Sequence, residues 1–441
     1  MGYYAFARSL LIEHRLDFTK DWQAANTSFR MGRLGDDGIP RPAEYTVTGH
    51  IDNHFAVGPA ILWSPFLIGT HAGVLLYDTL GGQVPADGFS RPYRIAMSIG
   101  TSIYGFLALV ISFSVARRYC SEFSALLATL GMWFASSLPV YMYFNPSWSH
   151  AHSAFMVALF VWFWIRTRPM RSLAQWIALG AIGGLMIDVY YLNAIVLLLP
   201  LLESLAEYRL SLRGAGLEPV GRLLVKNVAF AAILFVGFTP TLVTKKLIYG
   251  GYLRLGYREA WNWKSPALFK VAFSSDHGLF SWTPILILAV AGLWLLRRHD
   301  RVLSAYLLAV FVLYLYAMGC YQNWDGLSSF GNRFFVSLTS MFVLGLAALF
   351  DWLGSVWRER HAAIVSATAT AVLILGNFGL MFQWGTHLIP ARGPISWRDA
   401  AYNQMVVVPK EASQMMLNYL TRRKQLMDRI EEQDVRQLQH R

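Results

Sequence analysis

Arg333 places a cation in the first turn of an apolar stretch, where the local sequence gives no structural need for one. It follows the polar run WDGLSSFGN and opens an apolar stretch, 333–352, long enough to begin a membrane-spanning helix. The arginine fork makes bidentate contacts with phosphate, although an arginine near an interface can also extend to water without a specific partner. We favour the phosphate contact for Arg333, and we expect Asp325 in the same run to line a substrate cavity.

Two histidines also lie beside apolar stretches. His54 directly precedes FAVGP, and a helix N-terminus with a cationic neighbour favours an anionic lipid headgroup. His50 and His54 have helical i,i+4 spacing, but no third ligand is apparent, so we expect no metal site here. His150 belongs to FNPSWSHAH at the start of another apolar stretch, where an imidazole indicates either a polar cavity or a neutral interfacial residue.

Acidic residues that could act as a base lie near the N-terminus and between two predicted spans. Asp17 and Asp21 are four residues apart and share a face if a helix runs through them. Paired carboxylates at a membrane surface can bind a metal or deprotonate a hydroxyl, but two solvated aspartates at a helix end would look the same. Asp188 lies at the turn of a short hairpin, and an ionisable residue at that depth indicates a functional site unless water reaches it.

Aromatic residues gather in the same polar segments. Trp261 and Trp263 stand in a polar loop beside Lys264 and Glu259, where they could line a site for a sugar or a lipid headgroup. The alternative is an aromatic belt at the headgroup level of the bilayer. We place Trp261, Trp263 and Lys264 in the substrate cavity.

The composition indicates that lipid is the solvent of this chain. Hydrophobic residues make up 55% of its 441 residues and charged residues only 15%, with a mean hydropathy of +0.39. Soluble domains carry about a quarter charged residues, so this chain lacks the polar surface of a water-soluble protein. The net charge of +12 does not indicate nucleic-acid binding, because Lys and Arg punctuate apolar stretches instead of forming one stripe.

Ten apolar segments approach the length of spanning helices, so we expect an all-α polytopic membrane protein. Every second loop between them is basic, which places those loops in the cytoplasm and supports an even number of crossings. The ten segments are 94–116, 123–142, 152–167, 173–187, 189–206, 225–244, 279–297, 302–321, 333–352 and 362–384.

A further apolar segment, 55–80, could cross the membrane as well. Its glycines and prolines make it a poor straight helix, so we favour a helix at the outer interface or dipping into it. Three regions follow from this choice. They are an outer-face segment with interfacial helices, 1–93, a spanning bundle, 94–384, with outer active-site loops at 245–278 and 321–332, and an amphipathic outer-face tail, 385–441.

At these residues the chain resembles the GT-C superfamily of membrane glycosyltransferases, which includes the protein O-mannosyltransferases and the aminoarabinose transferase of lipid A. The resemblance covers nearly the whole chain and rests on the order and spacing of short motifs. These are YYAFARSLLIEHRLDF, NHFAVGPAILWSPF, NPSWSHAH, LIYGGYLRLGY, FSSDHGLFSWTPILILAVAGL, SFGNRFF and ISW.

The resemblance implies transfer of a sugar from a polyprenyl-phosphate donor to a lipid, glycan or protein acceptor on the outer face of the membrane. By position, His54 and Arg333 resemble the contacts to the donor phosphate, and His150 resembles a residue of the same cavity. An acidic residue of the first outer loop would act as base. The expected location is the bacterial inner membrane, with the catalytic loops on the periplasmic side. A divalent cation is a possible cofactor, since family members differ in this respect.

The N-terminus departs from the family pattern. Family members usually begin with a spanning helix and an acidic residue before the YY-x-x-ARSL stretch, whereas here Met1 and Gly2 directly precede Tyr3. We therefore expect the sequence to be a fragment that lacks the first helix, unless Asp17 or Asp21 serves as the catalytic base. The alternatives are a lipid or glycolipid transporter or flippase, and an inactive homologue that binds a glycolipid without chemistry.

Overall fold

The computed structural model describes residues 2–214, 216, 218–257 and 259–439, and in this part of the chain every regular element is helical. Isolated β-bridges occur between loops, but the described residues form no strand. The all-α class predicted from the sequence is therefore confirmed for these residues. The N-terminal region contains α1 (Gly2–Arg8), α2 (Thr19–Gln23), α3 (Thr27–Arg33) and α4 (Gly58–Thr79).

The remaining helices form a bundle and a tail. The bundle helices are α5 (Arg91–Ala116), α6 (Glu122–Phe134), α7 (His150–Arg166), α8 (Leu173–Val189), α9 (Leu198–Leu212), α10 (Val220–Tyr249), α11 (Leu268–Phe273), α12 (Leu279–Trp282), α13 (Ile285–Leu295), α14 (Arg301–Cys320), α15 (Thr339–Val356) and α16 (Glu359–Gly385). The tail comprises α17 (Trp397–Tyr402), α18 (Val408–Thr421) and α19 (Arg423–Gln439). Short 3-10 or π-helical turns occur at Ser9–Glu13, Pro42–Glu44, Val140–Phe144, Tyr191–Leu197, Leu296–Arg298, Arg333–Leu338 and Asn403–Val407.

Six helices among the described residues are long and apolar enough to cross a membrane, which indicates a multi-pass integral membrane protein. They are α4, α5, α10, α14, the continuous stretch Arg333–Val356, and α16. Helix α4 corresponds to the predicted interfacial segment. Its length and composition also suit a crossing, so its interfacial placement stays a prediction.

The other predicted spans contain shorter helices, and local breakers explain the shortening. Helix α6 ends at Phe134, before the run SSLP that contains Pro139. Helix α13 has only 11 residues because it begins at Ile285, directly after Pro284. Proline lacks an N–H and removes one helical hydrogen bond, so helices often begin or end beside it. Helices α4 and α10 nevertheless continue through Pro65 and Pro240.

Glycines let pairs of bundle helices approach very closely. Gly184 of α8 faces Gly237 of α10, and a Cβ on Gly184 would lie 2.4 Å from a backbone oxygen of α10. Gly292 of α13 faces Gly345 of α15, where a Cβ on Gly345 would lie 2.2 Å from the carbonyl oxygen of Ala289. Small residues at such crossings are typical of helix packing in membranes, where dispersion contacts replace the hydrophobic effect between helices.

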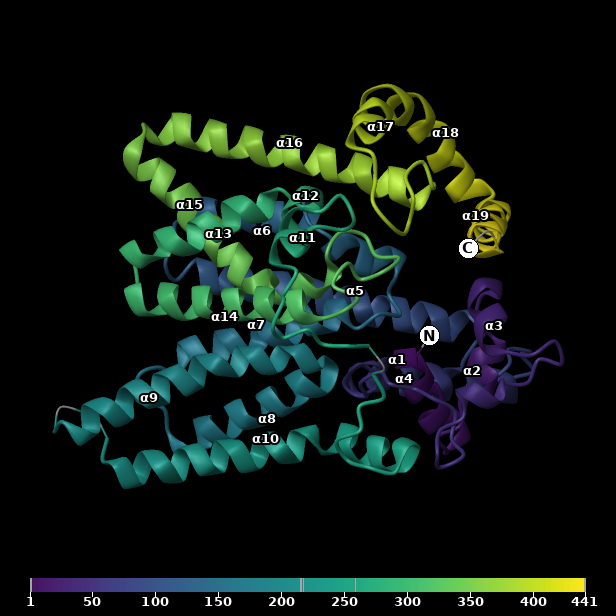
Figure 1. Ribbon diagram of the computed structural model, residues 1–441, viewed down its shortest axis with the longest axis horizontal. Coiled ribbons are helices and arrows are strands. Elements are labelled where there is room, and N and C mark those ends of the chain that lie inside the picture. Colours follow the sequence, from purple (N-terminus) through teal and green to yellow (C-terminus); the bar gives the residue numbers. More distant parts are fainter. Residues whose placement is uncertain (1, 215, 217, 258, 440–441) are drawn as a thin grey trace.

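The bundle helices run along the long axis of the molecule, and its two ends differ (Figure 1). The N-terminal helices α1–α3 and the tail helices α17–α19 gather at one end. The α9–α10, α13–α14 and α15–α16 turns lie at the other, and the last two carry Arg297, Arg298 and Arg358. These basic turns and the N-terminal and tail helices thus lie at opposite ends of the molecule, and the side of the membrane that each end faces stays a prediction.

Replacing Gly345 by alanine should destabilise the fold. The added Cβ would press on the α13 backbone, and overpacking of this kind costs about 1–3 kcal/mol. Gly354 lies in the same helix with nothing within 4 Å of its Cβ position, so Gly354→Ala should leave stability equal or higher. Thermal unfolding in detergent checks the pair. Equal midpoints for both variants would contradict the close crossing.

Candidate functional site

A large open cavity of about 2450 Å³ is lined by residues of the N-terminal segment, of the bundle and of the tail. Its lining comes from segments far apart in the sequence, including Tyr3, His54, His150, Trp261 and Arg333. Cavities with mostly apolar walls and a few convergent polar groups are the usual ligand sites of proteins. This cavity is therefore the candidate functional site.

Arg333 is oriented by the turn that precedes it. Its Nη1 donates a hydrogen bond of 2.6 Å to the carbonyl of Gly326, whose φ of +74° is accessible to glycine at little cost. The guanidinium carbon lies 4.4 Å from the ring centre of Trp148, a cation–π distance. These contacts leave further N–H donors of the fork for a ligand in the cavity.

His54 is positioned by a backbone segment that α10 holds in place. The Nζ of Lys245 donates hydrogen bonds of 3.0 Å to the carbonyl of Asn53 and 2.9 Å to that of Phe55, the two neighbours of His54. The Asn53 amide in turn donates to the Gly2 carbonyl at 3.0 Å. The His54 ring is thus fixed between ring contacts with Phe55 (4.3 Å) and Tyr257 (4.9 Å).

The charge state of His54 differs from the expected cation. Burial lowers the pKa of His54 to about 4, and the opposing effect of Asp52 does not offset it. At neutral pH the imidazole is therefore uncharged and can offer one N–H donor. The positive charge nearest the predicted phosphate must come from arginine.

His150 begins α7 and is almost completely buried in an aromatic cage. Its ring centre lies 4.7 Å from that of Tyr141, 5.8 Å from Tyr190 and 5.9 Å from Trp148. Its Nδ1 has no hydrogen-bond partner among the described residues. A buried polar atom without a partner costs free energy, which a ligand in the cavity could recover.

The cavity carries an excess of positive charge. Glu259 is the only carboxylate among the described lining residues, whereas the lining arginines are Arg33, Arg254, Arg333, Arg392 and Arg423. The wall along α16 is apolar and includes Leu375, Phe378 and Phe382. An anionic group with an apolar chain fits this combination of surfaces.

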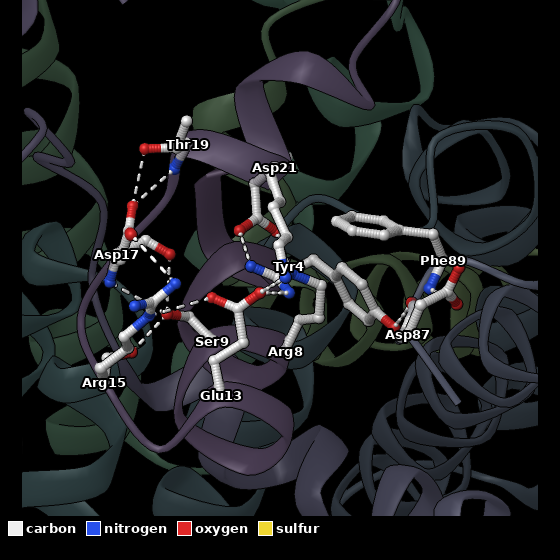
Figure 2. Close-up of polar contacts among 12 residues, drawn as sticks. Tyr4, Arg8, Ser9, Glu13, Arg15, Asp17, Thr19, Asp21, Asp87 and Phe89 are labelled. Atoms are coloured by element: carbon white, nitrogen blue, oxygen red, sulfur yellow. Dashed lines mark hydrogen bonds and ion pairs between the residues drawn. The ribbon is translucent and has the colours of Figure 1, made fainter. Parts of the chain in front are cut away.

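Asp17 and Asp21 do not line the cavity, and both are engaged elsewhere (Figure 2). Both Asp21 oxygens accept hydrogen bonds from Arg8, at 2.8 and 2.5 Å, and both side chains are 1% exposed. Burial raises the pKa of Asp21 to about 6, although Arg8 opposes this. Asp17 accepts hydrogen bonds from the backbone and the hydroxyl of Thr19 at 3.0 and 2.7 Å.

Glu13 joins the same network as the second partner of Arg8, at 2.9 Å (Figure 2). Burial acts to raise the pKa of Glu13, but hydrogen bonds from Arg8 and Lys20 outweigh it and bring the value to about 2. Arg8 thus binds two carboxylates and fixes the turn between α1 and α2. The sequence offered no sign of Glu13 as a partner, because the contact depends on the π-helical turn Ser9–Glu13.

Of the five predicted substrate-cavity residues, one is among the described lining residues and four are not. Trp261 lines the cavity, and its ring stacks on Trp263 at 5.3 Å and 13°. Trp263 and the exposed Lys264 lie outside the lining. Asp188 is buried in the helix packing, where its Oδ1 accepts a hydrogen bond of 3.0 Å from the Thr241 amide, and Asp325 is likewise not among the lining residues.

Glu259 is a lining residue that the sequence analysis named only as a neighbour of Trp261 and Trp263. The segment 260–263 pairs with the end of α14, through an Asn262 amide to Cys320 carbonyl bond of 2.6 Å and a Gln322 amide to Ala260 carbonyl bond of 3.0 Å. This pairing places Glu259 beside Asn323, whose side-chain amide lies 3.5 Å from the carboxylate. The contact joins two loops distant in sequence, so local spacing could not reveal it.

Comparison with known proteins shows likeness to solved structures only. No family model and no curated protein matches the chain. Among solved structures, the chain is similar to the crystal structure of ArnT from Cupriavidus metallidurans in the apo state. The identity is 13% and the TM-score 0.43, over 92% of this chain and 69% of that chain.

Replacing Asp21 by asparagine tests its structural role against the predicted catalytic one. The buried Arg8 would keep Glu13 but lose the charge of its fully buried partner, and since breaking a buried pair costs up to about 3–5 kcal/mol, the thermal midpoint should fall. Asp17→Asn is the matched control, because Asn can still accept the Thr19 bonds and Asp17 is 37% exposed. An unchanged midpoint for Asp21→Asn, together with lost activity, would instead support catalysis.

Proposed function

We propose that this protein is a membrane glycosyltransferase that takes a sugar from a polyprenyl-phosphate donor and transfers it to an acceptor at the outer face of the membrane. The observation that carries the proposal is the cavity, in which Arg333, His54 and His150 lie around a space bounded on one side by the apolar wall of α16. A lipid phosphate likewise combines a charged group, which suits the polar side chains, with an apolar chain, which suits the wall of α16. The predicted phosphate contacts are thus supported by a common location.

The donor phosphate would be bound mainly by Arg333. Its fork keeps free N–H donors after the bond to Gly326, and charge-assisted bonds to phosphate are about twice as strong as neutral ones. His54 supplies a neutral donor, and the unpartnered Nδ1 of His150 supplies another polar contact. The apolar side chains of α16 would contact the first isoprene units of the lipid.

The reaction would be a single displacement at the anomeric carbon. The acceptor hydroxyl oxygen forms a bond to this carbon as the bond to the phosphate oxygen breaks, and the phosphate leaves with the electron pair. Arg333 stabilises the charge that develops on the leaving phosphate. A carboxylate removes the acceptor proton.

We assign the base role to Glu259 within this proposal, because it is the only carboxylate among the described lining residues. Asp17 and Asp21 remain alternatives that the sequence predicts, but their described contacts are to Thr19, Arg15 and Arg8. A protein that binds the lipid phosphate without chemistry is the competing function. The observation that favours it is the excess of arginines over carboxylates among the described lining residues, which suits anion binding and requires no turnover.

Arg333→Ala should weaken binding of a short-chain polyprenyl phosphate roughly 10- to 100-fold, because a hydrogen bond to a charged group contributes about 1.5–3 kcal/mol. Arg333→Lys keeps the charge without the fork and should lose less. Isothermal titration calorimetry in detergent measures both, with the matching polyprenol as the ligand without phosphate. Arg358→Ala, an exposed change at the other end of the bundle, is the control. Unchanged affinity for Arg333→Ala would contradict the proposal.

Glu259→Gln should lower the rate of sugar transfer about 10²–10⁴-fold, the usual contribution of a positioned base, without weakening polyprenyl phosphate binding. Release of polyprenyl phosphate from a panel of polyprenyl-phosphate sugars measures the rate. The same assay on folded Asp17→Asn and Asp21→Asn identifies the base among the three. Phosphate-dependent lipid binding without any turnover by the wild-type chain would favour the binding protein over the enzyme.

A further inference from the structure

Three side chains with metal-binding atoms meet at the end of the bundle that carries the basic turns, away from the cavity. Cys120, His299 and Asp351 each offer one ligand atom, and these atoms all lie within 4.8 Å of one another. No other such group of three occurs among the described residues. The three positions belong to separate turns or helix ends, so only the fold brings them together.

Each residue is held by the local structure of its own segment. Cys120 follows α5, with its amide bonded to the Ala116 carbonyl at 2.9 Å, and it is 7% exposed. His299 stands in the α13–α14 turn, with its amide bonded to the Leu296 carbonyl at 2.9 Å. Asp351 lies near the end of α15, which packs against both α5 and α13. Turns on either side of one helix therefore present their side chains to it.

The Asp351 carboxylate has the orientation of a metal ligand. Its Oδ1 accepts a hydrogen bond of 3.0 Å from the Ser121 amide, while its Oδ2 lies 3.6 Å from the Nε2 of His299. A carboxylate that binds a metal through one oxygen commonly has the other held by a hydrogen bond. The Ser121 amide thus leaves Oδ2 facing the group.

We propose that Cys120, His299 and Asp351 bind a divalent transition-metal ion, with zinc as the best match. A thiolate, an imidazole and a carboxylate are the three side-chain ligand types of zinc. Zinc bonds of about 2.0–2.3 Å in tetrahedral geometry put ligand atoms roughly 3.3–3.8 Å apart. The 3.6 Å separation of His299 and Asp351 already fits, and Cys120 needs only a small side-chain movement.

The fourth position of such an ion would be taken by water. The side chains of His299 and Asp351 are 31% and 27% exposed, so the group is reached from solvent on one side while Cys120 closes the other. Binding converts the Cys120 thiol to a thiolate, and the proton goes to solvent. By the predicted topology this end faces the cytoplasm, where reducing conditions keep a free cysteine available.

The ion would tie the α5–α6 and α13–α14 turns to the end of α15. Its role is therefore to stabilise the bundle end opposite the cavity, and the proposal does not depend on the glycosyltransferase assignment. The alternative is a simple contact between His299 and Asp351 beside a cysteine that only packs. In the first possibility the Cys120 thiolate binds a metal ion, and in the second no ion is bound and the thiol is only packed.

Cobalt and zinc titration of the tag-free, metal-stripped full chain in detergent tests the proposal. We expect one equivalent of Co²⁺ to give a thiolate-to-cobalt charge-transfer band, which one equivalent of Zn²⁺ removes. The chain has only two cysteines, so Cys320→Ser is a matched control for Cys120→Ser. The band should vanish in Cys120→Ser and persist in Cys320→Ser. Zinc should also raise the thermal midpoint of the wild type and not that of Cys120→Ser.

His299→Gln and Asp351→Asn keep the thiol and test the other two ligands. Each should weaken zinc binding by more than the roughly 10- to 100-fold that changes in supporting hydrogen bonds cost. They also carry the test if Cys120→Ser does not fold. A wild-type chain without the charge-transfer band overturns the proposal. The same holds for a band that survives in folded Cys120→Ser, or for zinc affinity that neither His299→Gln nor Asp351→Asn alters.

Discussion

The contact between Lys245 and the backbone of residues 53–55 is the interaction on which the candidate site depends. Lys245 is completely buried in α10, where an amine without hydrogen bonds would be costly. The carbonyls of Asn53 and Phe55 satisfy it and thereby fix the N-terminal segment against the bundle. Together with the Asn53–Gly2 hydrogen bond and the ring contacts of His54 with Phe55 and Tyr257, this contact sets the position of His54. This hydrogen bonding joins the N-terminal segment to the bundle, and both contribute residues to the cavity.

Arg8 and Arg333 have different roles, one in the packing of the N-terminal region and the other in the proposed ligand site. Arg8 binds Asp21 and Glu13 inside the protein, and Lys20 adds a second cation 3.0 Å from Glu13. These contacts give the turn between α1 and α2 its shape. Among the described residues, the Arg333 side chain donates a hydrogen bond to the neutral carbonyl of Gly326 and packs on Trp148, so no described carboxylate is bonded to it. Burial alone therefore does not identify a functional residue. The partners of the buried group decide its role.

The fold keeps the two ends of the bundle chemically separate. Close glycine contacts between α13 and α15 and between α8 and α10 pack the helices tightly along their length. Arginines and aromatic residues surround an open cavity at one end, where an amphiphilic anion fits. At the other end, Cys120, His299 and Asp351 meet beside the basic turns. A tightly packed bundle can carry both candidate sites because each lies at an end of the bundle and neither places polar groups in the middle of the bundle.

The sequence by itself determined the helical class and the apolar segments, because hydrophobic length is a local property. Its phosphate-binding residues follow from side-chain chemistry and stay predictions. It could not determine where helices stop and restart around proline, as at Pro284, with enough accuracy to count the spans. Only the tertiary structure decided which ionisable groups share a space: Arg333 with Glu259 in one cavity, and Asp21 with Arg8 in a buried pair. These outcomes depend on contacts between segments distant in sequence, which residue spacing along the chain does not encode.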